Sequence, residues 1–175
     1  MADPAWLAAR IRDVPGFPRA GIVFKDITPL LADAAALSAT VEGLVSPRLD
    51  AGVDKVVGIE ARGFILAAPV ALALGAGFVP VRKAGKLPAQ VRAESYDLEY
   101  GTDTLEVHDD ALAPGERVLI VDDVIATGGT AAATARLVEG AGAVVAGLAF
   151  VIELASLAGR ERLAGYPTSS LVTFP

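Results

Sequence analysis

Two adjacent carboxylates, Asp122 and Asp123, follow a short apolar run and precede a turn of small residues. The apolar run, Val118 to Val121, is rich in β-branched residues and is typical of a buried strand. The turn spans Ala126 to Thr130 and contains two adjacent glycines, and the alanine-rich residues after it favour a helix. The pattern therefore predicts a strand whose carboxyl end carries two negative charges, followed by a glycine loop that opens a helix.

This arrangement predicts a binding chemistry. Glycine lets the backbone turn tightly and approach a ligand, and the N-terminus of a helix favours an anion such as phosphate. Thr127 and Thr130 can add hydroxyl donors, and the two carboxylates suit sugar hydroxyls or a magnesium ion reached through water. The segment therefore predicts a site for a phosphorylated ribose. The alternative is an ordinary strand–turn–helix, because short motifs often match by chance.

A basic residue, Arg62, follows another expected strand, Lys55 to Ile59, and precedes an apolar helix expected over Phe64 to Leu74. Arginine suits phosphate because its guanidinium donates two parallel hydrogen bonds. The alternative is a structural ion pair with the neighbouring Glu60, and spacing alone leaves both interpretations open.

A loop with three cations follows the next expected strand, Phe78 to Val81, in a chain whose net charge is −6. These cations are Arg82, Lys83 and Lys86. A solvated loop is the alternative interpretation. However, ligands of open parallel α/β sheets bind at the carboxyl ends of the strands, where this loop, Arg62 and the acidic pair all fall. We therefore expect one anion-binding site at that edge of the sheet.

Strands and helices alternate along most of the chain, which predicts an α/β fold with a mostly parallel, doubly wound sheet. Further strands are expected over 143–152 and 170–174, and helices over 34–46, 131–140 and 158–163. The 175 residues show no internal repeat and no low-complexity linker, so we expect a single domain over residues 1–175.

Two segments depart from this alternation. Asp3 and Pro4 predict the start of a helix that runs through Ile11, and residues 17–27 then form a loop leading into a short extended piece. Phe24 in this loop suits the face of a flat ring, although a surface crossover with an apolar anchor is the alternative. Residues 91–107 form two alternating runs around a turn, which predict an antiparallel hairpin that could act as a flap.

Composition excludes several functions. The chain has no cysteine, which excludes disulfides, thiolate catalysis and cysteine zinc sites and fits a cytoplasmic location. A net charge of −6 argues against general nucleic-acid binding. The N-terminus lacks the apolar core of a secretory signal. The uncharged stretch from Gly63 to Val81 is interrupted by glycine and proline, so a buried helix and strand explain it better than a membrane span.

The segment VLIVDDVIATGGT resembles the signature of type I phosphoribosyltransferases, in which four hydrophobic residues, two acids and a TGGT-like loop bind phosphoribosyl pyrophosphate (PRPP). Five further segments extend the resemblance over nearly the whole chain: GIVFKDITPLL, IEARGF, RKAGKLP, SYDLEYG and VIELASLAGRERL. The first and third of these are similar to the adenine branch of the family. Arg162 stands where lysine is often found, a departure that touches no catalytic residue.

The resemblance implies transfer of a 5-phosphoribosyl group from PRPP to N9 of adenine, with AMP and pyrophosphate as products and magnesium as cofactor. It also implies the type I phosphoribosyltransferase fold, with an antiparallel flap hairpin and a small hood from the N-terminal segment. A cis non-proline peptide is expected near Glu60 and Ala61. No direct protein ligand of the metal is expected, because magnesium would be held through PRPP and water.

The resemblance implies roles for individual residues. PRPP would bind at Arg62, Arg82, Lys83, Lys86, Tyr100, Asp122, Asp123, Ala126, Thr127, Gly128, Gly129 and Thr130, and adenine at Val23, Phe24, Lys25 and Leu154. Asp122 and Asp123 would face the ribose hydroxyls and favour the cationic sugar. Glu99 is the candidate base or orienting group, with an exposed hairpin residue as the alternative, and Tyr100 would close the site.

Adenine and PRPP are the expected partners, together with a second copy of the chain in a homodimer, and neither nucleic acid nor a membrane is expected. Two alternatives stay open at this point. One is a phosphoribosyltransferase for another base, such as orotate, xanthine or hypoxanthine. The other is a regulator that binds PRPP without turnover, although such regulators usually carry a basic DNA-binding domain that this acidic chain does not show.

Overall fold

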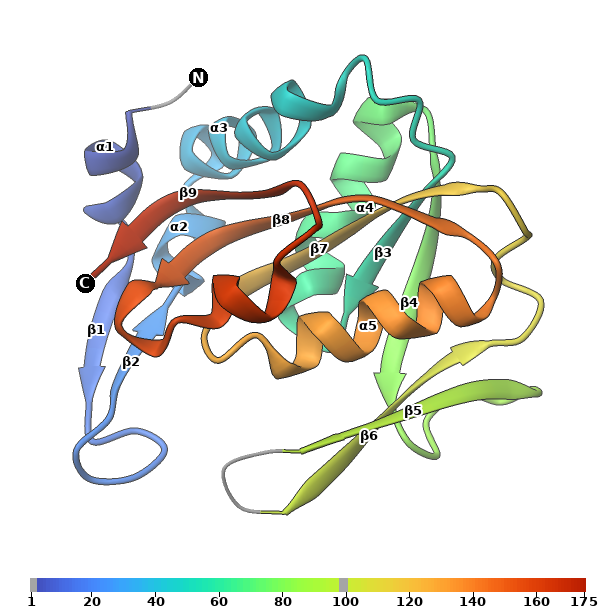
Figure 1. The fold of residues 1–175 in the computed structure, drawn as a ribbon. Helices are drawn as coiled ribbons and strands as arrows, with labels where there is room; N and C mark the ends of the chain where they lie inside the picture. The colour runs from blue at the N-terminus through green and yellow to red at the C-terminus, as the bar shows by residue number, and fades with distance from the viewer. Residues whose placement is uncertain (1–2, 98–100) are drawn as a thin grey trace.

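The central sheet lies between two layers of helices (Figure 1), in a computed structural model that describes residues 3–97 and 101–175. Its strands follow the order β5-β6-β4-β3-β7-β8-β9. They are β3 (Lys55–Ile59), β4 (Gly77–Lys83), β5 (Val91–Asp97), β6 (Thr102–His108), β7 (Arg117–Ile125), β8 (Val144–Leu154) and β9 (Thr168–Phe174). Strands β4, β3, β7, β8 and β9 pair in parallel, whereas β6 is antiparallel to β4 and to β5. The mostly parallel sheet with an antiparallel hairpin is therefore confirmed.

The helices are α1 (Pro4–Ala8), α2 (Thr28–Ala32), α3 (Ala34–Val45), α4 (Arg62–Leu74) and α5 (Gly129–Gly140), with short 3-10 helices η1 (Ser46–Arg48), η2 (Ala155–Leu157) and η3 (Gly159–Leu163). Asp3 caps α1 and Asp33 caps α3, each through a carboxylate that accepts backbone N–H groups. None of the helices in the described part of the chain is long and apolar enough to cross a membrane.

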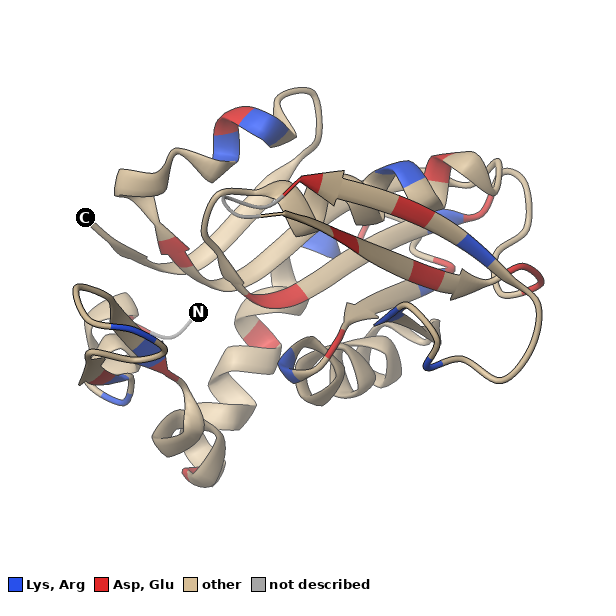
Figure 2. Ribbon diagram, turned by 90° about the horizontal axis from the view of Figure 1, so that it is seen from below, with Lys and Arg blue, Asp and Glu red and all other residues tan. Residues whose placement is uncertain are grey.

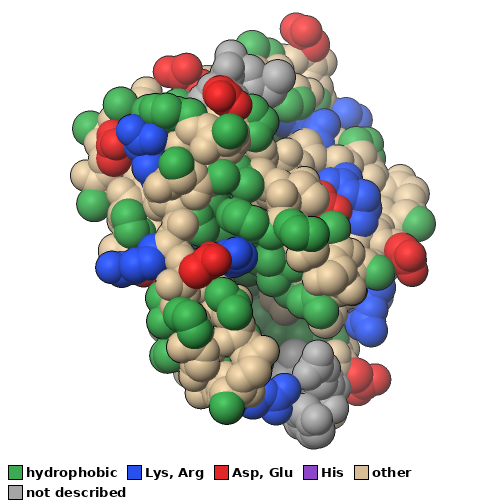
Figure 3. Space-filling view, turned by 90° about the vertical axis from the view of Figure 1, so that its left-hand side faces the viewer, with side chains coloured by type: hydrophobic (Ala, Val, Ile, Leu, Met, Phe, Trp, Pro, Cys, Tyr) green, Lys and Arg blue, Asp and Glu red, His purple; other side chains and the backbone are tan. Residues whose placement is uncertain are grey.

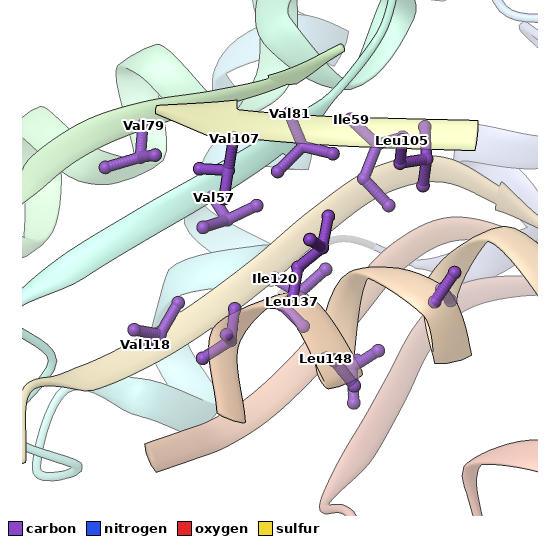
Figure 4. Close-up of a cluster of buried hydrophobic side chains, with 14 of the residues drawn as sticks. Val57, Ile59, Val79, Val81, Leu105, Val107, Val118, Ile120, Leu137 and Leu148 are labelled. Atoms are coloured by element: carbon purple, nitrogen blue, oxygen red, sulfur yellow. The ribbon is translucent and has the colours of Figure 1, made fainter. Parts of the chain in front are cut away.

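Alternate residues of β7 pack against opposite helix layers. Val118 and Ile120 belong to the hydrophobic cluster on the α5 side (Figure 4), and Leu119 and Val121 belong to the cluster that includes α3 and α4. All four side chains have no exposed surface. Because both faces of the sheet are covered, the strand is continuously apolar, as expected for a buried parallel strand.

The strand β7 is longer than the predicted run of four residues. It continues to Ile125, so Asp122 and Asp123 lie within the strand, near its carboxyl end, and not after it. The extension forms because β8 pairs with it up to the register Ile125↔Glu153. Tertiary pairing therefore overrides the low strand propensity of adjacent aspartates.

The N-terminal segment also differs from its prediction. The first helix ends at Ala8 and not at Ile11, because the chain turns into a strand, β1 (Arg12–Pro15), that pairs antiparallel with β2 (Val23–Asp26). This two-stranded sheet lies beside the ends of β8 and β9 (Figure 1). The predicted small hood is thus present as a hairpin, although β1 was not expected as a strand.

Candidate functional site

A pocket of about 490 Å³ opens at the carboxyl ends of the parallel strands. It is lined by Glu60, Ala61, Arg62, Lys83, Tyr96, Asp103, Leu105 and residues 122–131. The face of the molecule at the carboxyl ends of β8 and β9 has a hollow near its centre, with hydrophobic side chains around it (Figure 3). The structure therefore brings together the three charged loops that sequence analysis placed at one sheet edge.

The glycine loop between β7 and α5 has the backbone geometry of an anion seat. Gly128 is the N-cap residue of α5 and has a left-handed φ of 78°. A Cβ at Gly128 would overlap the carbonyl oxygen of Gly159, so the loop packs backbone to backbone against the start of η3. Because residues 126–130 line the pocket, the N–H groups of the first turn of α5 border the space where a phosphate can lie.

Asp123 is almost buried, with 4% of its surface exposed, and it pairs with Arg62 across the pocket floor. The Nε atom of Arg62 donates to Oδ2 of Asp123 over 2.5 Å. The alternative that Arg62 pairs with Glu60 is therefore wrong. Arg62 stands at the first position of α4, next to a cis peptide bond between Glu60 and Ala61, as expected.

Asp122 points toward the N-terminus of α4. A Cβ at Gly63 would lie 2.8 Å from Oδ1 of Asp122, so only glycine allows the helix and the strand to meet this closely. The same Oδ1 accepts a hydrogen bond of 2.9 Å from the backbone N–H of Asp123. Burial, and then the charge of Asp123, raise the pKa of the Asp122 carboxyl well above its usual range.

Glu60 organises the basic loop at the pocket edge. Its carboxylate accepts from Nε of Arg82 over 3.2 Å, from the backbone N–H of Lys83 over 3.1 Å, and from Lys86. Burial alone would raise the pKa of Glu60, but these donors, Lys86 foremost, outweigh burial and lower it. Arg82 and Lys86 are thus bonded to Glu60, which lines the pocket, whereas Lys83 lines the pocket itself.

The hood carries three of the four residues expected around adenine. Phe24 lies with its ring 4.8 Å from the guanidinium carbon of Arg62 and 5.2 Å from the ring of Phe17, centroid to centroid. Lys25 points away, since its Nζ pairs with Asp13 over 2.7 Å. Val23 is half exposed on the same strand. Through its side chain, Phe24 thus contacts Arg62, which lines the pocket.

Leu154, the fourth residue, ends β8, where it pairs with Phe174 of β9. The predicted Glu99 and Tyr100 lie outside the described residues. Among residues 3–97 and 101–175, no group of three or more His, Cys, Asp or Glu side chains could hold a metal ion.

Sequence reasoning missed the roles of three polar side chains that line the pocket: Glu60 as an organiser of cations, Tyr96 and Asp103. Tyr96 and Asp103 stand opposite each other in the β5–β6 register, which the two alternating runs of the sequence did not fix. Glu60 was considered only as a partner of Arg62. Its contact with a loop more than twenty residues away depends on the pairing of β3 with β4.

Residues 24–171 match the phosphoribosyl transferase domain family. The adenine phosphoribosyltransferase of Thermobifida fusca is 58% identical over 93% of each chain. A crystal structure of adenine phosphoribosyltransferase from Rhodothermus marinus is 58% identical and has a TM-score of 0.94 over 97% of each chain. The Saccharomyces cerevisiae enzyme, in a complex with adenine and an imino-altritol bisphosphate, is 40% identical with a TM-score of 0.90, over 96% of this chain and 97% of that one.

Proposed function

The chain belongs to the adenine phosphoribosyltransferases of the phosphoribosyl transferase family, and from this membership we propose how its pocket binds PRPP and adenine. The enzyme is a glycosyltransferase that moves a 5-phosphoribosyl group from PRPP to N9 of adenine, giving AMP and pyrophosphate, a reaction of purine salvage. The observation that carries the proposal is the single pocket in which the glycine loop, the acidic pair and Arg62 meet.

The 5′-phosphate binds at the loop from Ala126 to Thr130. The N–H groups at the start of α5 and the hydroxyls of Thr127 and Thr130 are donors, and the helix dipole favours the anion. The left-handed Gly128 supports this assignment, because it turns the backbone tightly at the edge of the pocket.

The ribose hydroxyls donate to Asp122 and Asp123. When they bind, Arg62 exchanges part of its bond with Asp123 for the pyrophosphate, which Lys83 also contacts. Arg82 and Lys86, held on Glu60, extend the positive charge toward the same group. As the C1–O bond breaks, these cations stabilise the leaving pyrophosphate, and the acidic pair stabilises the positive charge that builds up on the ribose.

Adenine lies against the ring of Phe24, with backbone groups of Val23 and Lys25 at its edge and Leu154 near its other face. The position of Phe24 beside Arg62 supports this placement, because it brings the hood within reach of the ribose. Glu99 takes or orients the N9 proton and Tyr100 covers PRPP, two roles that stay predictions because these residues lie outside the described part of the chain.

Magnesium fits the pocket as a substrate-bound ion. Mg²⁺ usually keeps several waters and binds one or two carboxylates together with substrate phosphates, and Asp122 and Asp123 offer two carboxylates at the pocket. We propose that the ion is held by PRPP and that these two carboxylates accept hydrogen bonds from its waters. When bound, it neutralises phosphate charge and so favours departure of pyrophosphate.

A homodimer and a cytoplasmic location stay predictions. The dimer is supported by apolar side chains exposed on neighbouring elements, Ile65 and Leu72 of α4 and Phe78 of β4. Light scattering that gives a mass near 17.8 kDa, the mass of one chain, would contradict it.

The proposal is tested by measuring AMP formation with adenine, hypoxanthine, guanine, xanthine and orotate as acceptors. Only adenine should be used efficiently, and a chelator should stop the reaction until Mg²⁺ is restored. Asp123→Asn should lower kcat/KM by about tenfold to a hundredfold, because it removes a charge-assisted hydrogen bond. Asp110→Asn, in an exposed turn outside the pocket, is the matched control. Efficient use of another base but not adenine, or an Asp123→Asn variant as active as the control, would refute the assignment.

A further inference from the structure

Tyr96 and Asp103 face each other near the turn end of the β5–β6 hairpin, whose strands carry mostly acidic residues (Figure 2). Both line the pocket, yet neither belongs to the charged loops that identified it. The ring of Tyr96 packs in the α5-side hydrophobic cluster and only 8% of the residue is exposed. The pair therefore has a fixed position from which its polar atoms meet the pocket.

Three polar contacts join this pair to each other, to the glycine loop and to the basic loop. The hydroxyl of Thr130 donates to the Tyr96 hydroxyl over 3.3 Å, and the Tyr96 hydroxyl donates to Oδ2 of Asp103 over 3.4 Å. The same Oδ2 pairs with Nζ of Lys83 over 3.0 Å. The Tyr96 hydroxyl and the Asp103 carboxylate thus each accept from a neighbouring donor. The contacts form a continuous series from Thr130 of the glycine loop to Lys83 of the basic loop.

The protonation states of the groups suit this sequence of contacts. Burial raises the pKa of the Tyr96 phenol, so the hydroxyl keeps its proton and can donate. The hydrogen bond from Lys83 lowers the pKa of Asp103, which stays an acceptor. The same bond raises the pKa of Lys83, which keeps its charge.

We propose that Tyr96 and Asp103 are positioning residues that fix the spacing between the 5′-phosphate end and the pyrophosphate end of the PRPP site. This inference rests on the proposed function, in which Thr130 and Lys83 bind those two ends. A ligand that occupies both ends at once gains from the fixed spacing, because less freedom is lost when it binds. A ligand that occupies only one end does not.

The test compares PRPP, which spans both ends, with AMP, which has the 5′-phosphate but no pyrophosphate. Tyr96→Phe removes the hydroxyl and keeps the buried ring. We expect calorimetry to show PRPP binding weakened about threefold to tenfold, the value of one or two neutral hydrogen bonds, and AMP binding weakened less than twofold. The KM for PRPP should rise by a similar factor, and kcat should stay within twofold. Tyr166→Phe, which removes a phenol hydroxyl bonded to Glu139 and outside the pocket, is the matched control.

Asp103→Asn gives a second and independent variant. It keeps an oxygen that accepts from Tyr96 but removes the charge that holds Lys83, so PRPP binding should again weaken more than AMP binding. The double variant should lose no more PRPP affinity than the product of the single losses, and less if the two residues act as one unit. If Tyr96→Phe fails to fold, the comparison of Asp103→Asn with wild type decides.

The possible outcomes separate this inference from the proposed function. Equal weakening of PRPP and AMP, or PRPP binding equal to that of the Tyr166→Phe control, overturns the positioning role while leaving the enzyme assignment intact. Wild-type protein that neither binds PRPP nor forms AMP overturns the proposed function itself, and the positioning role falls with it.

Discussion

At the scale of single residues, the cations at and beside the pocket are paired with carboxylates of the same chain. Asp123 holds Arg62, Asp103 holds Lys83, and Glu60 holds both Arg82 and Lys86. Long basic side chains are thereby kept in place in a protein whose net charge is −6. Under the proposed function, we expect pyrophosphate to exchange partners with groups that these pairs already hold in place, which lowers the entropic cost of binding.

A titration prediction concerns Asp26, at the base of the hood. Hydrogen bonds from the Thr28 hydroxyl, and then from Arg12, lower the pKa of Asp26 from 3.8 to about 2. Because the folded pKa lies below the unfolded value, the carboxylate stabilises the protein above about pH 4 and loses this effect as the pH falls toward about 2. Asp26→Asn should therefore lower Tm at neutral pH, with a difference that disappears in acid.

Thermal melts of wild type and Asp26→Asn from pH 7 down to pH 2 provide the measurement. Asp13→Asn, in the facing strand, is the control. It removes the ion pair with Lys25, but the Asp13 side chain is more than half exposed, so the effect on Tm should be smaller. A Tm difference for Asp26→Asn that stays constant over this range would show that the charge of Asp26 is not its source.

At the scale of elements, the glycine loop is positioned by η3 as well as by β7 and α5. Gly159 begins η3 and approaches the loop so closely that a Cβ there would overlap the carbonyl oxygen of Ala126 and lie 2.8 Å from the backbone nitrogen of Gly128. Backbone cannot move aside as a flexible side chain can. The shape of the loop therefore depends on a segment more than thirty residues further along the chain.

Gly159→Ala should consequently impair PRPP binding although Gly159 does not line the pocket. We expect a stability loss of about 1–3 kcal/mol from overpacking and a higher KM for PRPP, because the loop must shift. Gly140→Ala is the matched control, since a Cβ there would meet only Cδ of Arg92 at 3.8 Å. Equal Tm and KM values for the two variants would contradict this dependence.

At the scale of the whole molecule, the pocket is assembled from segments that are far apart in the sequence. The connection from β3 to the start of α4, strand β4, the β5–β6 hairpin and the β7–α5 junction each contribute lining residues. A ligand that touches all of them stabilises only the folded arrangement. Ligand binding is therefore expected to stabilise the molecule as a whole.

This expectation can be measured as a thermal shift. PRPP with Mg²⁺ at about a hundred times its Kd should raise Tm by about 5–10 °C, from a linkage energy of about 2.7 kcal/mol and the usual unfolding entropy of a chain of this size. Glycerol 3-phosphate, a phosphate ester without a ribose, serves as the control ligand. An equal shift with that compound would mean that the pocket recognises phosphate alone.

The order of elements and the chemistry of the site could be predicted from local patterns. The apolar run Val118 to Val121, the acidic pair and the glycine loop stand next to each other in the chain, so their geometry follows from strand and helix stereochemistry. The sheet edge was predictable for Arg62 and Lys83 as well, because parallel strands end on the same side. Side-chain partners were less accessible, since Arg62 pairs with Asp123 and not with its sequence neighbour.

The sequence by itself determined a doubly wound parallel sheet with a glycine loop and two acids at one edge, because these features depend on contacts between neighbouring residues and on simple periodicity. Only the tertiary structure decided that β1 forms, that β7 reaches Ile125, and that Tyr96 and Asp103 connect the two sides of the pocket. Those features depend on which strand pairs with which and in what register, and such pairings join residues whose separation in the chain leaves no local signal.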